Sequence, residues 1–253
     1  MKRLLKSCVL AFSYYTKIPM PELHYEAHDG DYMFCFFPLI GILIGAAETL
    51  WLWISRFSAA GNLLTAAIAV AIPILITGGI HLDGLLDASD AIASWKSREE
   101  RLQIMHDTHT GAFAVITCAV FLMLALGGAA GVSVKFPAAA WFIFSSGRMF
   151  TSLLVVFERP AGKSGMLYSC TKQAAARSIM ISMAVYLLIL TGIAYRLDVL
   201  KQWGILAAAG IIILFVYKSY IRRMFGGITG DLAGCFLSVY ELILVLTAAF
   251  LHV

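Results

Sequence analysis

Apolar runs close to the length needed to cross a lipid bilayer recur along the whole of this 253-residue chain. A transmembrane helix needs about 20 consecutive, mostly apolar residues. Charged residues make up only 13% of the chain, whereas an average soluble domain contains about 25%. The mean hydropathy of +0.85 is too high for a chain that must present a polar surface to water on all sides. The sequence therefore predicts an all-α, polytopic integral membrane protein.

The predicted spans follow one another with short connections. We expect about seven of them, at 34–55, 62–80, 112–133, 137–157, 178–195, 202–220 and 233–252. The first twenty residues combine a basic start with a short apolar middle, which is typical of a helix that lies in the membrane interface. The chain has no linker long enough to separate domains and no evident repeat, so residues 1–253 are expected to form a single domain.

The basic residues predict the orientation of the chain. With the N-terminus in the cytoplasm and seven spans, 14 of the 19 Lys and Arg residues fall on the cytoplasmic side, in line with the excess of positive charge in cytoplasmic loops. The far side receives only Arg56, Lys135, Arg196 and Lys201, and Arg148 falls inside a span. We therefore assign the net charge of +4 to topology, and expect the bilayer and no nucleic acid as a partner.

The densest group of acidic residues lies in TGGIHLDGLLDASD, residues 77–90, where the second predicted span ends on the cytoplasmic side. Asp83, Asp87 and Asp90 are spaced i, i+4, i+7, so a helix places all three within a strip about 60° wide. Three carboxylates on one strip repel each other unless a cation lies among them. Because the first and last are about 10 Å apart along the helix axis, one ion needs ligands from another segment, or a second ion must bind.

Two further aspartates are expected on the same side, Asp107 in RLQIMHDTHTG and Asp231 in GGITGD. We expect both to converge with Asp83 and Asp87 on one cavity facing the cytoplasm. Oxygen ligands suit Mg²⁺, which keeps several waters and bridges to phosphate oxygens. The alternative is that these aspartates cap helices or are solvated loop charges. That alternative is weakest for the three-aspartate strip, because charges beside a membrane span are costly.

Glycines accompany the acidic segments. Gly78 and Gly79 precede the aspartate strip, Gly111 lies in the second acidic segment, and Gly230 directly precedes Asp231. Glycine lets a backbone approach a phosphate closely, and a helix N-terminus just beyond it favours an anion. Membrane helices also use glycine freely, so the indication of a phosphate site comes from the repetition of this arrangement on one face.

Arg148, in SSGRMF, is a basic residue inside a predicted span. Such a residue must find a partner or a polar cavity, and marks a functional candidate. We expect it to line the same cavity as the aspartates and to pair with a phosphate or with an acidic residue such as Glu241 in the last span. For His81, His106 and His109 no spacing supports a zinc site, so polar contacts are the favoured interpretation.

These motifs resemble those of one family. TGGIHLDGLLDASDAIAS and RLQIMHDTHTG look like the TGG-x-H-x-DG-x-x-D-x-x-D and R-x-x-IM-x-D-(S/T)-x-x-G signatures of cobalamin synthase (adenosylcobinamide-GDP ribazoletransferase). FSYYTKIPMP, FFPLIGILIGA and GGITGDLAG with Glu241 are also similar to that family, in order from about residue 12 to 250. The family usually carries Arg where this chain has His109, so that contact would fall to His109 or another basic residue. Glu48 has no counterpart in the family pattern.

The resemblance implies a reaction and its setting. Adenosylcobinamide-GDP and α-ribazole, or its 5′-phosphate, would give adenosylcobalamin, or its 5′-phosphate, and GMP. In a phosphoryl transfer of this kind the protein mainly positions the substrates and neutralises their charge, and it contributes little covalent chemistry. The resemblance also implies a requirement for Mg²⁺ and a place in the prokaryotic cytoplasmic (inner) membrane, with the active site facing the cytoplasm.

The candidate site residues fall into three groups. Catalytic roles are expected for Asp83, Asp87, Asp107, His81 and Arg148. Substrate contacts are expected from Gly78, Gly79, Gly111, Gly230, Arg101, His109 and Glu241. Metal ligands are expected among Asp83, Asp87, Asp90, Asp107 and Asp231. The expected partners are the two substrates and the bilayer, and association with other late cobalamin-pathway enzymes or with further copies of the chain is left open.

Two other functions share some of these features. CDP-alcohol phosphotransferases also use an aspartate-rich helix, but their motif places an Ala-Arg pair four residues after DG, where this chain continues with Leu85, Leu86 and Asp87. A cation transporter would place its charges near the bilayer midplane and often shows inverted repeats. The clustering of acids on one face and the absence of a repeat argue against a transporter.

Overall fold

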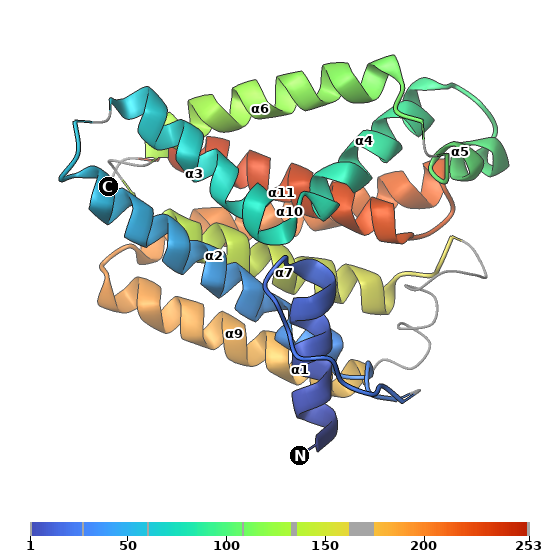
Figure 1. Ribbon diagram of the computed structural model, residues 1–253, viewed down its shortest axis with the longest axis horizontal. Coiled ribbons are helices and arrows are strands. Elements are labelled where there is room, and N and C mark those ends of the chain that lie inside the picture. Colours follow the sequence, from blue (N-terminus) through green and yellow to red (C-terminus); the bar gives the residue numbers. More distant parts are fainter. Residues whose placement is uncertain are drawn as a thin grey trace.

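The computed structural model describes residues 2–26, 28–59, 61–107, 109–132, 136–161 and 175–251. Within these ranges, helices dominate and most run along the long axis of the molecule (Figure 1). Six of them are long and apolar enough to cross a membrane: α2 (Met33–Ser55), α6 (Ala112–Val132), α7 (Ala139–Phe157), α9 (Ala176–Arg196), α10 (Leu200–Met224) and α11 (Gly230–Phe250). They correspond to six of the seven predicted spans, so the prediction of an all-α membrane protein is confirmed.

The second predicted span is broken. α3 (Asn62–Thr77) and α4 (Ile80–Ala93) meet at an angle of 93°, and between them Gly78 and Gly79 have φ values of +66° and +77°. A side chain at either position would be strained. The prediction of one continuous span over 62–80 is therefore wrong at its end. The candidate spans number six, or seven if this bent pair is one span.

Burial divides the helices into an inner and an outer group. In the apolar windows, 72% of α7 and 56% of α11 is buried inside the protein, against 11% of α6 and 22% of α9 and of α10. α7 packs against α2, while α11 packs against α4, α6 and α7. α6, α9 and α10 thus expose long apolar faces, as expected for helices whose outer surface contacts lipid.

The two ends of the bundle differ in the helix ends and charged residues that they contain. One end, at the right of Figure 1, collects α4, the short helix α5 (Arg98–Ile104), the last turn of α10 and the first turn of α11. We call it the acidic end, because it carries Asp83, Asp87 and Asp231. The opposite end carries the α2–α3 and α9–α10 connections. Three basic residues of the charge count, Lys135, Lys163 and Lys172, lie outside the described residues.

The N-terminal helix α1 (Lys2–Tyr15) packs against α2. It is only 14 residues long, too short to span a bilayer at 1.5 Å per residue. Its Leu4 and Leu5 side chains are 46% and 67% exposed, which fits an apolar face turned towards lipid. The predicted interfacial helix is therefore present as a helix of the expected length and character.

Candidate functional site

Two close helix contacts bring the aspartates of α4 to the start of α11. A Cβ atom on Gly84 would collide with the backbone of Asp231, and one on Gly234 would press on the backbone of His81. The absence of side chains at these two glycines lets α4 lie directly on the first turns of α11. Asp231, far from α4 in sequence, is thereby placed beside the aspartate strip.

The charges at this junction form one interacting group. Asp83, Asp231 and Asp90 all act electrostatically on Asp87, and so does His106. Asp231 in turn lies within electrostatic range of His106 and Asp83. We call Asp83, Asp87, Asp231 and His106 the acidic site. Asp83 and His106 are exposed while Asp87 and Asp231 are half-buried, so the acidic site is open at the acidic end.

Asp90 lies on the same helix and has a different environment. Its carboxylate accepts hydrogen bonds from the backbone N–H groups of Gly111 at 2.7 Å and Ala114 at 2.9 Å. These are donors at the start of α6 that have no partner within that helix. Asp90 therefore caps α6 from another helix and ties α4 to it, which is the structural role considered for the aspartates. A metal-binding role for Asp90 stays a prediction.

The segment between α5 and α6 contains Asp107, His106 and His109, and their surroundings differ from those predicted. The Asp107 side chain is 56% exposed and accepts a hydrogen bond from the His109 backbone N–H at 3.1 Å, while the His109 ring lies at 2.7 Å. His106, which we had assigned only polar contacts, is the histidine that acts on Asp87 and Asp231. Its position next to the aspartate of the second motif was the available signal. The roles proposed for Asp107 and His109 stay predictions.

The loop that leads to Asp231 is fixed from several sides. Thr229 accepts a hydrogen bond from the Leu232 N–H at 3.2 Å and so caps α11. Arg101 donates to the Met224 carbonyl at 3.3 Å, where α10 ends. The Arg98 guanidinium lies directly over Gly226, whose φ is +78°. Arg101, expected to contact substrate, thus also holds the scaffold, and Gly230 is exposed at the start of α11.

The donor set of the acidic site has the chemistry that Mg²⁺ prefers. Mg²⁺ is usually held by one or two carboxylates together with waters and substrate phosphate oxygens. Within the described ranges, no three His, Cys, Asp or Glu side chains are close enough together to hold a metal ion by themselves. The acidic site thus fits an ion shared with a phosphate, and does not form a closed protein cage.

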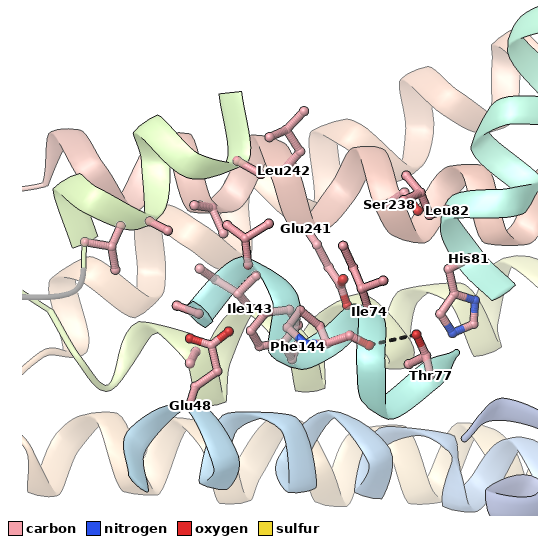
Figure 2. Close-up of a pocket in the computed structure, with 18 of the residues that line it drawn as sticks. Glu48, Ile74, Thr77, His81, Leu82, Ile143, Phe144, Ser238, Glu241 and Leu242 are labelled. Atoms are coloured by element: carbon pink, nitrogen blue, oxygen red, sulfur yellow. Dashed lines mark hydrogen bonds between the residues drawn. The ribbon is translucent and has the colours of Figure 1, made fainter. Parts of the chain in front are cut away.

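A second charged region lies within the helix bundle. A cavity of about 120 Å³ opens between α2, α3, α4, α6, α7 and α11, with mostly apolar walls. Four ionisable side chains contribute to the walls: Glu48, His81, Arg148 and Glu241. Figure 2 shows Glu48 on one side of the cavity and His81 on the other, with Glu241 between them. We call these four residues the buried cluster.

Arg148 is fully buried and forms the centre of this cluster. It donates to Glu241 Oε1 at 2.7 Å and to the Phe144 carbonyl at 3.0 Å, and its guanidinium lies 5.6 Å from the centre of the Phe37 ring. The expectation that Arg148 has an acidic partner in the last span is met. The expectation that it lines one cavity with the aspartates is wrong, because none of the five aspartates contributes to these walls.

Two members of the buried cluster differ from the prediction. Glu48 was not among the predicted site residues, and His81 was predicted to act with the aspartates. Glu48, which has no counterpart in the family pattern, is only 8% exposed. The His81 ring stacks on Tyr15 and meets Phe37 edge-on, while its Nε2 atom is buried and has no hydrogen-bond partner among the described residues. His81 therefore lies on the side of α4 that packs inward, although it is only two residues from Asp83.

Comparison with known proteins gives a consistent family assignment. The sequence profile of a family described as cobalamin-5-phosphate synthase matches residues 7–249. A protein of Lachnoclostridium phytofermentans is 39% identical over 94% of this chain and 91% of its own length. Proteins of Clostridium botulinum (30% identical, 96% of each chain) and Desulfitobacterium hafniense (29%, 94% of each) are also similar. All three are named adenosylcobinamide-GDP ribazoletransferase. No solved structure matches the chain.

Proposed function

The chain belongs to the cobalamin-5-phosphate synthase family, and we infer that it catalyses the transfer for which its relatives are named, with adenosylcobinamide-GDP and α-ribazole, or its 5′-phosphate, as substrates. The observation that carries this inference beyond the family name is the junction of α4 and α11. There Asp83, Asp87 and Asp231 gather at one open end of a membrane-embedded bundle. A phosphoryl-transfer enzyme needs such a concentration of hard oxygen ligands.

The reaction exchanges one phosphorus–oxygen bond for another. A ribazole hydroxyl attacks the phosphorus on the cobinamide side of the pyrophosphate and forms the new phosphodiester. The bond from that phosphorus to the bridging oxygen breaks, and GMP leaves with the bridging oxygen. The hydroxyl proton passes to a base or to water. No covalent intermediate with the protein is needed, so the work of the site is to align the two substrates and balance their charge.

The residues of the acidic site suit these tasks. Asp83 and Asp87 are held on a helix that is packed on both sides, against α11 through Gly84 and against α6 through Asp90. Carboxylates on a rigid element keep their positions when substrates bind. His106 can donate a hydrogen bond to a phosphate oxygen or to one of the neighbouring carboxylates. The four side chains therefore offer a place where an acceptor hydroxyl and a pyrophosphate can meet.

We propose that the reaction depends on Mg²⁺ held by one or two of the carboxylates of Asp83, Asp87 and Asp231 together with substrate oxygens. Without a cation, a pyrophosphate would be repelled by this group of carboxylates. The ion supplies charge neutralisation for the pyrophosphate and the departing GMP. GMP release should therefore stop when Mg²⁺ is removed with a chelator, and should return when Mg²⁺ but not Ca²⁺ is restored, because Ca²⁺ prefers longer bonds and more ligands.

We also propose that the acidic end faces the cytoplasm of a prokaryotic cell, with the N-terminus on the same side. The segments at the acidic end carry eight basic residues among those described: Lys96 between α4 and α5, Arg98 and Arg101 in α5, Arg159 after α7, Arg177 in the first turn of α9, and Lys218, Arg222 and Arg223 near the end of α10. The described segments at the opposite end carry only Arg56 after α2, Arg196 at the end of α9 and Lys201 in the first turn of α10. This asymmetry supports a cytoplasmic acidic end. Labelling a single cysteine introduced at Glu99 or at Ser58 in intact cells, with a reagent that cannot cross the membrane, tests the orientation.

The decisive experiment is an assay of the purified protein in detergent or nanodiscs. GMP release should require both adenosylcobinamide-GDP and an α-ribazole acceptor, and a corrinoid product should appear in equal amount. Release of GMP without acceptor would point to a hydrolase. No release with either form of the acceptor, in a folded preparation with Mg²⁺, would refute the proposed function.

A further inference from the structure

A lipid-facing groove runs between α1 and α9, away from both charged regions. It has a volume of about 760 Å³, and α2 forms its floor with Tyr32, Cys35 and Phe36. α9 forms one wall, from Ser178 to Ile189, and α1 contributes Arg3 and Leu4. α2 packs against both of the other helices. The groove is therefore a built feature of three helices.

The length of the groove matches one leaflet of a bilayer. Ser178 and Ile189 are eleven residues apart on α9, which corresponds to about 16 Å at 1.5 Å per residue. Half of the hydrocarbon core of a bilayer is about 15 Å thick. Ser178 lies in the first turn of α9, at the acidic end, and Ile189 lies just past the middle of this helix. With α9 crossing the bilayer, the groove would extend from the membrane surface at the acidic end to about the midplane.

The charge and polarity of the groove change along this length. Its deeper wall consists of apolar side chains such as Val185 and Ile189, which are about half exposed. Arg3, which is exposed, also lines the groove, and Arg177 precedes Ser178 on α9. The nearby Lys6 is bonded to Asp29 at 2.7 Å, and Arg3 lies within electrostatic range of the same carboxylate. An amphiphile with an anionic head and a long apolar chain is complementary to this pattern.

We propose that the groove is a binding site for an anionic phospholipid, with the phosphate at Arg3 and one acyl chain along α9 towards Ile189. The lipid would fill the space between the interfacial helix and the bundle. It would thereby fix α1, whose C-terminal end at Tyr15 contacts His81. This inference does not depend on the reaction that the acidic site catalyses.

The test uses the intact protein in nanodiscs of phosphatidylglycerol or phosphatidylcholine, released into detergent and weighed by native mass spectrometry. Wild-type protein should retain phosphatidylglycerol through delipidation. Val185→Trp, which fills the groove, should lose it. Leu188→Trp is the matched control, because Leu188 is on the same helix and 72% exposed but lies outside the groove wall. It should retain lipid as wild type does.

A second variant tests the headgroup contact. Arg3→Gln should lower the preference for phosphatidylglycerol over phosphatidylcholine about fivefold, as expected for loss of one basic residue near a membrane surface. Arg196→Gln, at the opposite end, should leave the preference unchanged. Equal lipid retention by Val185→Trp and Leu188→Trp would overturn the proposal. So would a change from dimer to monomer in Val185→Trp without loss of lipid, since the groove would then be an interface between copies.

Discussion

The acidic site and the buried cluster contain the same kinds of side chain, but they use them in opposite ways. In the buried cluster, the one guanidinium is directly bonded to the carboxylate of Glu241 at 2.7 Å. In the acidic site, the charges that act on Asp87 are those of three other aspartates, Asp83, Asp231 and Asp90, and of His106. The Arg148–Glu241 pair therefore balances its charge within the protein, whereas the acidic site carries an excess of negative charge that a cation can neutralise.

This difference follows from the surroundings of each region. A charge inside a membrane is costly and must be paired within the protein. At an open end, water and ions can neutralise carboxylates, so a group of acids can persist without protein partners. The excess of carboxylates in the acidic site therefore indicates a ligand-binding role, whereas the Arg148–Glu241 ion pair indicates a structural role. We expect the acidic site to respond to substitution in activity and the buried cluster to respond in stability.

The largest expected effect is on catalysis at the acidic site. Asp87→Asn should lower GMP release about 100-fold or more, since loss of a ligand to a cation that neutralises a phosphoryl transfer costs several kcal/mol. Asp83→Asn and Asp231→Asn should act similarly. Folding should be retained, because the change preserves the size of the side chain. Initial rates at saturating Mg²⁺, together with thermal unfolding in detergent, measure both quantities.

A matched control for these variants is Asp198→Asn. Asp198 is exposed at the opposite end and has a φ of +57°, a conformation that asparagine also tolerates. Its substitution should leave the rate of GMP release unchanged. Near-normal rates in Asp83→Asn, Asp87→Asn and Asp231→Asn alike would show that the acidic site is not where the transfer takes place.

The next effect concerns the stability of the buried cluster. Arg148→Met leaves the Glu241 carboxylate without its partner and should destabilise the fold by about 3–5 kcal/mol, and Glu241→Leu should do the same to the guanidinium. The double variant should be more stable than either single variant, because it removes both charges. Folded yield and thermal unfolding of the three variants test this. A double variant as unstable as the sum of the singles would contradict an internally balanced pair.

Arg148→Lys separates this structural role from phosphate binding. A single Arg148 nitrogen donates both to Glu241 and to the Phe144 carbonyl, so the lysine ammonium, which has three donors, can keep the ion pair. We expect a small loss of stability and a rate of GMP release close to wild type. A large loss of rate with an unchanged KM for the acceptor and unchanged stability would instead show that the guanidinium binds the pyrophosphate.

A third prediction compares two aspartates on one helix. Asp90→Ala should cost about 1 kcal/mol of stability, because it removes the cap of α6. Asp90→Asn keeps an oxygen that can accept one of the two hydrogen bonds, and should reduce GMP release far less than Asp87→Asn. The ratio of the two Asn variants measures how different their roles are. Equal losses of activity would place Asp90 in the metal site.

Much of the fold, and part of the difference between the acidic site and the buried cluster, could be predicted from the sequence. Apolar length gave six membrane helices, and the i, i+4, i+7 spacing placed Asp83, Asp87 and Asp90 on one helix, which α4 confirms. The pairing of Arg148 with Glu241 was one of two alternatives considered. These features depend on local periodicity or on the high cost of a charge in lipid, and both can be read from a single segment.

The remaining features depend on contacts between distant segments. The spacing of the aspartates did not indicate that Asp90 would face the start of α6 while Asp87 faces Asp231. Which partner each position on a helix meets is decided by how the neighbouring helices pack. The bend at Gly78 and Gly79 turned His81 towards Tyr15 and Phe37 and so separated it from the aspartates. The position of His106 depends on how α5 packs against α4 and the end of α10, and no local pattern specifies these contacts.

The smallest expected effect tests the scaffold beneath the acidic site, and it depends on pH. Glu158 follows α7 and its side chain is buried between Arg222 at 2.9 Å and Lys218 at 3.5 Å on α10. Burial works to raise the pKa of Glu158, but hydrogen bonds from Arg222 and from the backbone outweigh it, and the pKa is lowered below the usual value. A carboxyl with a lowered pKa stabilises the fold above its pKa in the unfolded chain.

That stabilisation disappears as the pH falls through the lowered pKa, because the folded chain then also takes up the proton. Glu158→Gln should therefore be slightly less stable than wild type at pH 7, and the difference should shrink below about pH 4, the ordinary range for a glutamate. Arg222 is half exposed, so the effect should be smaller than that of Asp90→Ala. Thermal unfolding of both proteins at pH 7 and in the acid range tests this. A difference that stayed constant with pH would mean that packing of the Glu158 side chain, and not its charge, joins α7 to α10.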